Sequence, residues 1–259
     1  MNSEDPPVPQ GSQSPRLGSL PTELLDQTVL ELPVEHMVMA MSVSRRFKAI
    51  ISSNLNLMLD RAMQAIEEDR LKVMLTFAPP AFAHRFVICR NMTAGQVNGY
   101  VTTYSSFSQP SVFAPNQGTP RDASEILCKS FLQEVDIHDE EAFTQLKVSI
   151  QIASTPGSSW FTNRTLIFDS TIRLPREWLD GRAGELLWLD DAKSFGLHVQ
   201  SHPKQVPDPV EGTSYYDLEV DALHIQATRF LAAVKEAERK EEKETHLTLT
   251  HNSRFSLVW

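Results

Sequence analysis

Cysteine is scarce in this chain, which has 2 among its 259 residues. Cys89 and Cys128 lie far apart in the sequence, and neither belongs to a CxxC pair. They therefore supply neither a disulfide framework nor a zinc site built on paired cysteines. We expect both to be small apolar side chains in a reducing compartment, which favours a cytoplasmic or nuclear protein.

Long apolar runs and an excess of basic charge are also lacking. No segment reaches the 18 or so apolar residues that a membrane-spanning helix needs, and residues 1–17 have no apolar stretch of a secretory signal. The 33 acidic residues outnumber the 24 basic ones, for a formal net charge of -9. This balance argues against nucleic-acid binding and against docking on anionic membranes. We predict neither kind of partner.

Signatures of catalysis are missing as well, since the chain has no P-loop, GxGxxG or GxSxG motif. Histidines stand near carboxylates twice: His198 and His202 follow residues 190–191, and His138 lies within the acidic segment 136–140. A strand pattern and a following proline keep His198 and His202 off a shared helical face, so neither place is typical of a metal site. We predict no enzyme, no catalytic residue, no cofactor and no metal.

What the chain does contain is a change in the spacing of its apolar residues after its first quarter. Residues 1–17 are polar and rich in proline, which predicts a disordered tail. Residues 18–68 carry apolar positions at helical spacing, and residues 69–259 carry short apolar or alternating runs between turn signals. We predict an α+β protein with an N-terminal three-helix module. A mainly antiparallel, β-sandwich-like domain with one or two short helices is expected to follow.

In the helical module, Pro21 and Pro33 predict where the first two helices begin. The second helix is expected over 35–41, with Met37, Val38 and Met41 inward. A third helix is expected over 43–51, and a fourth over 55–66 leading out of the module. A further short helix is expected at Pro175–Leu179, ending at Gly181.

The predicted strands share short apolar or alternating runs bounded by turn residues. They are Leu71–Phe77, Arg85–Cys89, Gly99–Tyr104, Ser130–Ile137, Thr144–Ile152, Arg164–Ile172, Leu186–Leu189, Phe195–Gln200, Tyr215–Val220, His246–Thr250 and Phe255–Trp259. The last two would flank a hairpin turn at 251–253. The stretch 222–243 stays open between strand and helix in its first half and favours helix in its second. The mixed charges of 235–244 predict a solvated helix end or an exposed loop.

The most specific pattern opens the helical module. It consists of Leu-Pro-Thr-Glu-Leu-Leu at 20–25, Val-Leu-Glu-Leu-Pro at 29–33 and Val-Ser-Arg-Arg-Phe-Lys at 43–48. A unit this small is marginal by itself, and its apolar residues are too many for it to bury. We therefore expect it to dock on another protein, as amphipathic helices do in a partner's groove.

These three segments resemble the F-box, the adaptor-binding module of ubiquitin-ligase substrate receptors. The family pattern has Leu-Pro, an acidic residue two positions later, two apolar pairs, a Leu-Pro break and a closing Val-Ser-Arg-x-Phe. This chain departs from it at Met37, Met39 and Met41, where leucines are common, and at Phe47, where tryptophan is commoner. Methionine fills such positions flexibly, so the helical fold is still expected.

The resemblance implies a substrate receptor of a cullin-RING ubiquitin ligase of the SCF type. Its helical module would bind the Skp-type adaptor, and its C-terminal domain would bind a protein target that the sequence does not name. The positions carried over as adaptor-binding are Leu20, Pro21, Glu23, Leu24, Leu25, Val29, Leu30, Leu32, Pro33, Val43, Arg46 and Phe47. Some of them must pack the module internally, and the sequence does not sort the two groups.

The remaining chain is similar, more loosely, to filamentous-fungal F-box proteins with an uncharacterised β-rich C-terminal region. The segments that carry this likeness are 134–136 with 143–146, 173–179, 187–191 with 196–197, and 216–219. No ligand or reaction comes with them. An alternative is a lectin-like or small-ligand-binding β domain with a secondary F-box, because tryptophan faces stack on sugar rings. The tryptophans are Trp160, Trp178, Trp188 and Trp259.

Overall fold

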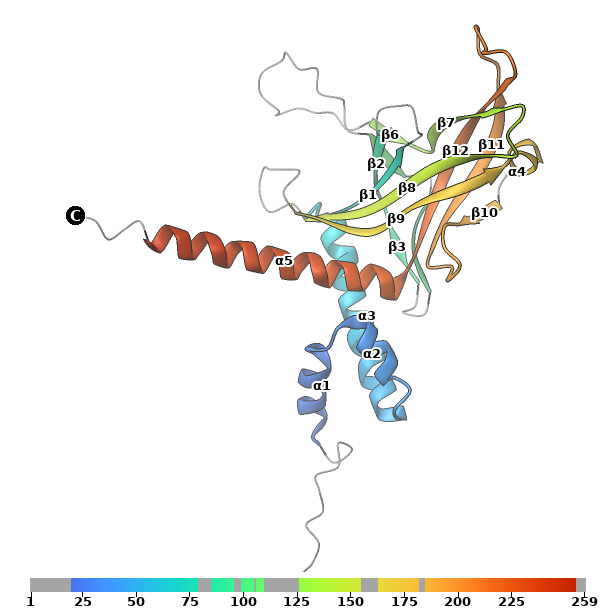
Figure 1. Cartoon of the computed structure of the whole chain (residues 1–259). Helices are drawn as coiled ribbons and strands as arrows, with labels where there is room; N and C mark the ends of the chain where they lie inside the picture. Colours follow the sequence, from blue (N-terminus) through green and yellow to red (C-terminus); the bar gives the residue numbers. More distant parts are fainter. Residues whose placement is uncertain are drawn as a thin grey trace, which may run out of the picture. The chain divides into compact units, whose positions relative to one another are not determined.

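In the computed structural model the described residues are 20–78, 85–95, 99–104, 106–109, 126–154, 163–181 and 185–254. The chain divides into two units, residues 1–54 and residues 55–259. The first unit is helical where it is described, and the second is built mainly of antiparallel strands (Figure 1). The predicted α+β class with mostly antiparallel sheets is confirmed.

Proline and serine set the helix starts in the first unit. Helices α1 (Thr22–Leu30) and α2 (Val34–Ala40) each follow a proline, Pro21 or Pro33, whose ψ is 147° or 148°. Proline has no N–H to donate, so it is tolerated where a helix begins. Helix α3 (Arg45–Glu67) begins after Ser44, whose Oγ accepts a hydrogen bond from the Phe47 backbone N–H at 3.2 Å.

Helix α3 runs without a break for 23 residues, so the prediction of two separate helices over 43–51 and 55–66 was wrong. The polar segment 52–54 lies between the two predicted helices, and serine and asparagine side chains can compete for backbone hydrogen bonds. Here the Asn54 Nδ2 donates instead to Asp26 Oδ1 at 2.7 Å, which ties α3 to α1 and leaves the helical backbone bonds intact.

The second unit contains two six-stranded sheets, and all strand pairs among its described residues are antiparallel. The first sheet has the order β6-β5-β2-β1-β8-β9. The second has the order β10-β11-β12-β4-β3, and β7 also pairs with β12. The strands are β1 (Leu71–Ala78), β2 (Arg85–Cys89), β3 (Thr93–Ala94), β4 (Tyr100–Tyr104), β5 (Phe107–Gln109), β6 (Ile126–Cys128), β7 (Phe131–His138), β8 (Phe143–Ser154), β9 (Asn163–Pro175), β10 (Glu185–Trp188), β11 (Phe195–Lys204) and β12 (Thr213–Gln226).

The core of the second unit lies between its two sheets. Along β7 buried and exposed side chains alternate strictly, as expected for a strand with one wet face. The ring of Phe77 on β1 stacks on that of Phe131 on β7, with 5.4 Å between their centroids. Phe168 on β9 lies 4.8 Å from Phe195 on β11. Each pair joins one sheet to the other, so the sheets face each other across a shared core.

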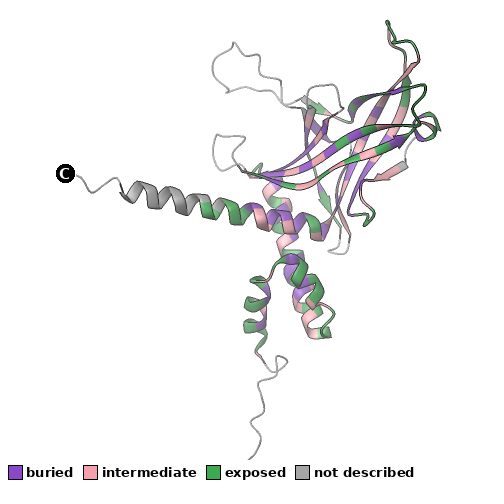
Figure 2. Ribbon diagram, in the orientation of Figure 1, coloured by how far each residue is buried: buried purple, intermediate pink, exposed green. Residues whose placement is uncertain are grey.

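Two helices accompany the sheets. Helix α4 (Arg176–Gly181) confirms the short helix predicted after Pro175. Helix α5 (Ala227–Arg254) follows β12 directly, which settles the open stretch 222–243 as strand to Gln226 and helix from Ala227. Phe230, Leu231 and Val234 at the start of α5 are buried. Figure 2 shows buried residues along this first part of the helix, which packs against β8 and β9.

The far part of α5 corrects two predictions. The expected strand at 246–250 and the turn at 251–253 both fall within α5. The alternation at 246–250 favoured a strand, but no glycine or proline follows Ala227 to end the helix. The last expected strand, 255–259, lies outside the described residues. The charged segment 235–244 belongs to this helix. Of the two alternatives expected for it, a helix end or a loop, the helix is the one observed.

Nine of the predicted strands are present, with bounds that coincide or differ by at most six residues. Among the described residues, no helix combines the length and apolar character needed to cross a membrane.

Candidate functional site

The structure sorts the residues of the helical motif by burial. Leu25 and Val29 of α1 are buried, together with Val34 and Met37 of α2, and these side chains form the interior of the helical unit. Leu20, Leu32, Arg46 and Phe47 are half-buried. Pro21, Glu23, Leu24, Leu30, Pro33 and Val43 are exposed. Leu25 and Val29 therefore pack the unit internally, whereas the exposed group is available to a partner.

Large apolar side chains are exposed unusually often in this unit. Among the described residues eleven are exposed, and five of them fall in the short stretch from Leu24 to Val43. We refer to these five as the exposed apolar set: Leu24, Leu30, Val38, Met39 and Val43. Met39 and Val43 are 71% and 69% exposed. Concentrations of exposed apolar surface mark interaction sites in soluble proteins.

The methionine-rich second helix contributes to this set in a way the sequence did not predict. Met37 is fully buried, as expected, but Val38 is exposed and Met41 is half-buried. The prediction that Val38 lies inward was wrong. A helix of 7 residues offers one narrow stripe for burial, and Val34 and Met37, one turn apart, occupy it.

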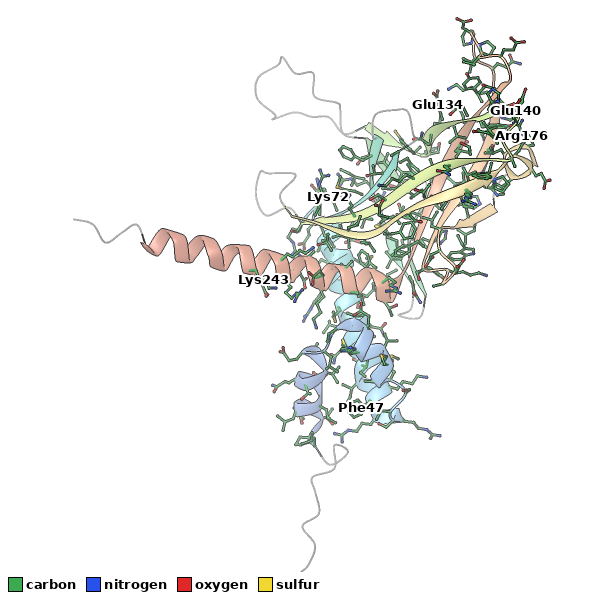
Figure 3. All side chains as sticks on the ribbon, viewed as in Figure 1. Phe47, Lys72, Glu134, Glu140, Arg176 and Lys243 are labelled. Atoms are coloured by element: carbon green, nitrogen blue, oxygen red, sulfur yellow. The ribbon has the colours of Figure 1, made fainter. Side chains whose placement is uncertain are left out.

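Arg46 joins the two ends of the motif. Its Nη2 donates to the backbone carbonyl of Leu20 at 2.8 Å and to Thr22 Oγ1 at 2.9 Å. The sequence had placed Arg46 among the adaptor contacts. In this structure its guanidinium holds the start of α1 against the start of α3. Phe47, which follows it in the sequence, is labelled in Figure 3.

On the second unit, the outer side of the β11–β12 pair carries a ladder of polar pairs between the two strands. His198 Nδ1 lies 2.6 Å from Asp221 Oδ1, and His202 Nε2 lies 3.3 Å from Glu219 Oε2. Lys204 Nζ lies 3.1 Å from Asp217 Oδ1 and also contacts Glu134 of β7 (labelled in Figure 3). Such polar cross-strand pairs favour this strand register, although partly exposed pairs contribute little energy each.

The partners of these histidines differ from the ones that lie close in sequence. Asp190 Oδ1 accepts hydrogen bonds from the backbone N–H groups of Ser194 at 2.7 Å and Phe195 at 3.0 Å, so this carboxylate stabilises the turn before β11. Within the described part of the chain, no three His, Cys, Asp or Glu side chains come together to hold a metal ion.

His224 lies near this ladder on β12. Burial lowers the pKa of its imidazole below the usual 6.5, and the neighbouring His198 lowers it further, while Asp221 acts in the opposite direction. His224 is therefore kept mainly neutral at physiological pH.

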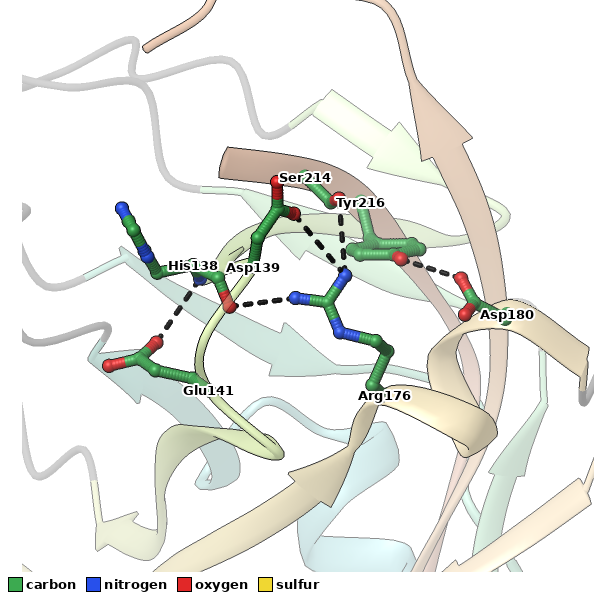
Figure 4. A network of polar contacts seen from close by, with 7 residues as sticks. All are labelled: His138, Asp139, Glu141, Arg176, Asp180, Ser214 and Tyr216. Carbon is green, nitrogen blue, oxygen red and sulfur yellow. Dashed lines mark hydrogen bonds and ion pairs between the residues drawn. The ribbon is translucent and has the colours of Figure 1, made fainter. Parts of the chain in front are cut away.

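A second polar network ties α4 to the turn between β7 and β8 (Figure 4). Arg176 Nη2 donates to the His138 carbonyl at 2.7 Å, and its Nη1 lies 3.6 Å from Asp139 Oδ1 and 3.5 Å from Ser214 Oγ. The Tyr216 hydroxyl donates a hydrogen bond to Asp180 Oδ1 at 2.6 Å. Burial and this carboxylate raise the pKa of the Tyr216 phenol. These bonds join α4, the turn between β7 and β8, and β12. The network therefore stabilises the fold at this end of the sheets.

The tryptophans offer little open ring surface where they are described. Trp178 is only 9% exposed. The ring of Trp188 lies 5.5 Å from that of Tyr100 and has the Lys193 Nζ 6.0 Å from its centroid. Trp160 and Trp259 lie outside the described residues.

Neither Cys89 nor Cys128 forms a disulfide within the described part of the chain. Cys89 is fully buried, and burial raises the pKa of its thiol far above the usual range. Such a thiol is unreactive, in line with the expected role as a small apolar side chain.

Comparison with known proteins gives no family for this chain: no protein-family model matches it, and neither the curated proteins nor the solved structures include a significant match.

Proposed function

We propose that this protein is an F-box substrate receptor of a cullin-RING ubiquitin ligase. The helical unit would bind a Skp-type adaptor, and the β-sandwich-like second unit would bind a protein target. The observation that carries the proposal is the exposed apolar set, of which Leu24, Leu30 and Val43 fall within the segments of the F-box-like pattern. Two of its members, Leu24 and Leu30, belong to the apolar pairs of that pattern.

The packing of the helical unit supports this assignment. Leu25 and Val29 hold α1 from inside, while Leu24 and Leu30 remain 50% and 40% exposed on the same helix. Because removal of apolar surface from water drives association, a partner that covers these side chains would gain free energy. The Arg46 bonds to Leu20 and Thr22 fix the ends of the motif before any partner arrives, which lowers the entropy cost of binding.

The mechanism we propose is proximity. One unit is held by the ligase and the other holds the target, which raises the effective concentration of target lysines near the charged ubiquitin-conjugating enzyme. The chain itself would perform no chemistry and need no cofactor. It would act in the cytoplasm, the nucleus or both.

The direct test is co-elution of the full chain with a Skp-type adaptor in size-exclusion chromatography. We expect a stable complex with the wild type and its loss in the double variant Leu24→Asp with Leu30→Asp. Aspartate at these exposed positions brings a charge into the interface that docking would bury, without touching the interior of the unit. Leu20→Asp with Pro21→Ala is expected to lose binding too, but it also disturbs the start of α1.

The matched control is Leu132→Asp with Val210→Asp, which adds the same two charges at exposed apolar positions of the second unit. This control should co-elute like the wild type, and circular dichroism should show both variants folded. Co-elution of the Leu24/Leu30 variant at wild-type level would exclude the exposed apolar set as the adaptor surface.

A further inference from the structure

A cavity of about 470 Å³ lies in the second unit between the C-terminal half of α3 and the first half of α5. Its inner wall is formed by buried apolar side chains: Ala62 of α3, Leu71 at the start of β1, and Leu231 and Val234 of α5. A cavity of this size lies within the range of small-molecule sites. At roughly 30 Å³ for each water-sized group, it has room for about fifteen such groups.

Its charged lining is basic although the chain as a whole is acidic. The cavity is lined by Arg61 of α3, Arg70 of the turn before β1 and Lys235 of α5, and Glu238 is the one acidic residue in the lining. The whole chain has 33 acidic against 24 basic residues, so this local reversal favours an anion. Arg70 is oriented by Glu68, whose Oε2 lies 2.6 Å from its Nη2.

One wall also holds an unused polar atom. The Oγ of Ser154 at the end of β8 is buried and makes no hydrogen bond within the described part of the chain. Buried polar groups are nearly always hydrogen-bonded, so an unpaired hydroxyl in a cavity wall indicates a missing partner. A hydroxyl can donate to a ligand oxygen.

We propose that this cavity binds a free amphiphilic anion, with an apolar body of about eight carbons along the inner wall and a carboxylate or phosphate head at the cations. The apolar body contacts Leu231 and Val234, and the head group pairs with Arg61, Arg70 and Lys235. The inference does not rest on the proposed ligase function, because the lining begins at Met58 and the exposed apolar set ends at Val43.

The test is isothermal titration calorimetry of the full chain with octanoate, octyl phosphate, octanol and inorganic phosphate. The two amphiphilic anions should bind, and octanol and inorganic phosphate should each bind at least about tenfold more weakly, since each lacks one half of the ligand. Arg61→Glu should weaken octanoate binding by about tenfold or more, because it inverts a charge at the head group. Lys129→Glu, an identical charge change at an exposed residue outside the lining, should leave the affinity within about twofold.

A second variant tests the cavity itself. Ala65→Phe places a ring in the lining and should abolish octanoate binding while circular dichroism and the melting temperature show a folded protein. Wild-type affinity in both Arg61→Glu and Ala65→Phe would overturn the proposal, as would equal binding of octanol and octanoate or no binding at all. Sedimentation with phosphatidylserine vesicles provides the last arm: adsorption to vesicles without binding of free octanoate would also overturn it.

Discussion

Arg46 shows at the scale of one residue how the structure refines the sequence pattern. The pattern placed it among residues that touch a partner, because it stands in the closing Val-Ser-Arg-Arg-Phe segment. In the structure the guanidinium hydrogen-bonds Leu20 and Thr22 at the opposite end of the motif. Those bonds are long-range in sequence, so no local pattern could have predicted them.

Arg46→Ala is expected to lower the stability of the helical unit by about 1 to 2 kcal/mol, since it removes charge-assisted hydrogen bonds. Hydrogen exchange measured by mass spectrometry should show faster exchange in α1 and unchanged exchange in β7 and β12. Arg46→Lys keeps the charge but loses the forked geometry, so it should fall between the wild type and the alanine variant. Unchanged exchange in α1 of the alanine variant would show that these bonds do not stabilise the unit.

His224 gives the second unit a sensitivity to mild acid. Its pKa in the folded state is lowered below 6.5 by burial, so as the pH falls through 6.5 the unfolded chain binds the proton more readily. The contribution of the neutral His224 to folding stability is therefore lost progressively as the pH falls below 6.5. The urea midpoint should drop more between about pH 7.5 and about pH 5.5 in the wild type than in His224→Gln, which cannot titrate there. Equal drops would contradict this explanation.

At the scale of elements, aromatic pairs connect the two sheets. Phe77 and Phe131 are both fully buried and stack across the core. In a double-mutant cycle, Phe77→Leu and Phe131→Leu should show a coupling of about 0.5 to 1.5 kcal/mol, as measured for aromatic pairs.

Phe77→Leu combined with Phe143→Leu is the control for that cycle, because Phe143 is partly exposed and lies under the Arg173 guanidinium at 4.8 Å. The losses of stability caused by Phe143→Leu and by Phe77→Leu should simply add in the double variant. A coupling energy as large in the control as in the stacked pair would mean that the coupling comes from a general loss of packing. It would then not report a specific interaction between the rings of Phe77 and Phe131.

Alternation made several elements predictable from the sequence. β7 and β8 bury every second side chain over much of their length, and this period of two is visible in their residues. The strands β3, β5 and β6, with 2, 3 and 3 residues, are too short to show a period and were missed. The strand predicted at 246–250 failed because a five-residue alternation cannot outweigh a helix that continues from Ala227 without a breaker.

At the scale of the whole molecule, α3 belongs to both units, since they divide between Asn54 and Leu55. The apolar pattern of the sequence changes from helical to strand-like at residue 69, just before the strands begin. The structural boundary lies earlier, because it depends on which residues contact each other in space. The candidate docking residues lie within one short segment of the chain, so a sequence motif was enough to identify them. Which of them are exposed, and which side chains of α3 and α5 line one cavity, depends on contacts between distant segments.

The measurement that tests the central proposal most directly is a calorimetric titration of the full chain with a Skp-type adaptor at several temperatures. Burial of the exposed apolar set predicts binding near one-to-one with a negative heat-capacity change, and loss of both in Leu24→Asp with Leu30→Asp. A folded wild-type chain that gives no binding heat at any of these temperatures, and no complex in size-exclusion chromatography, would contradict the proposed receptor function.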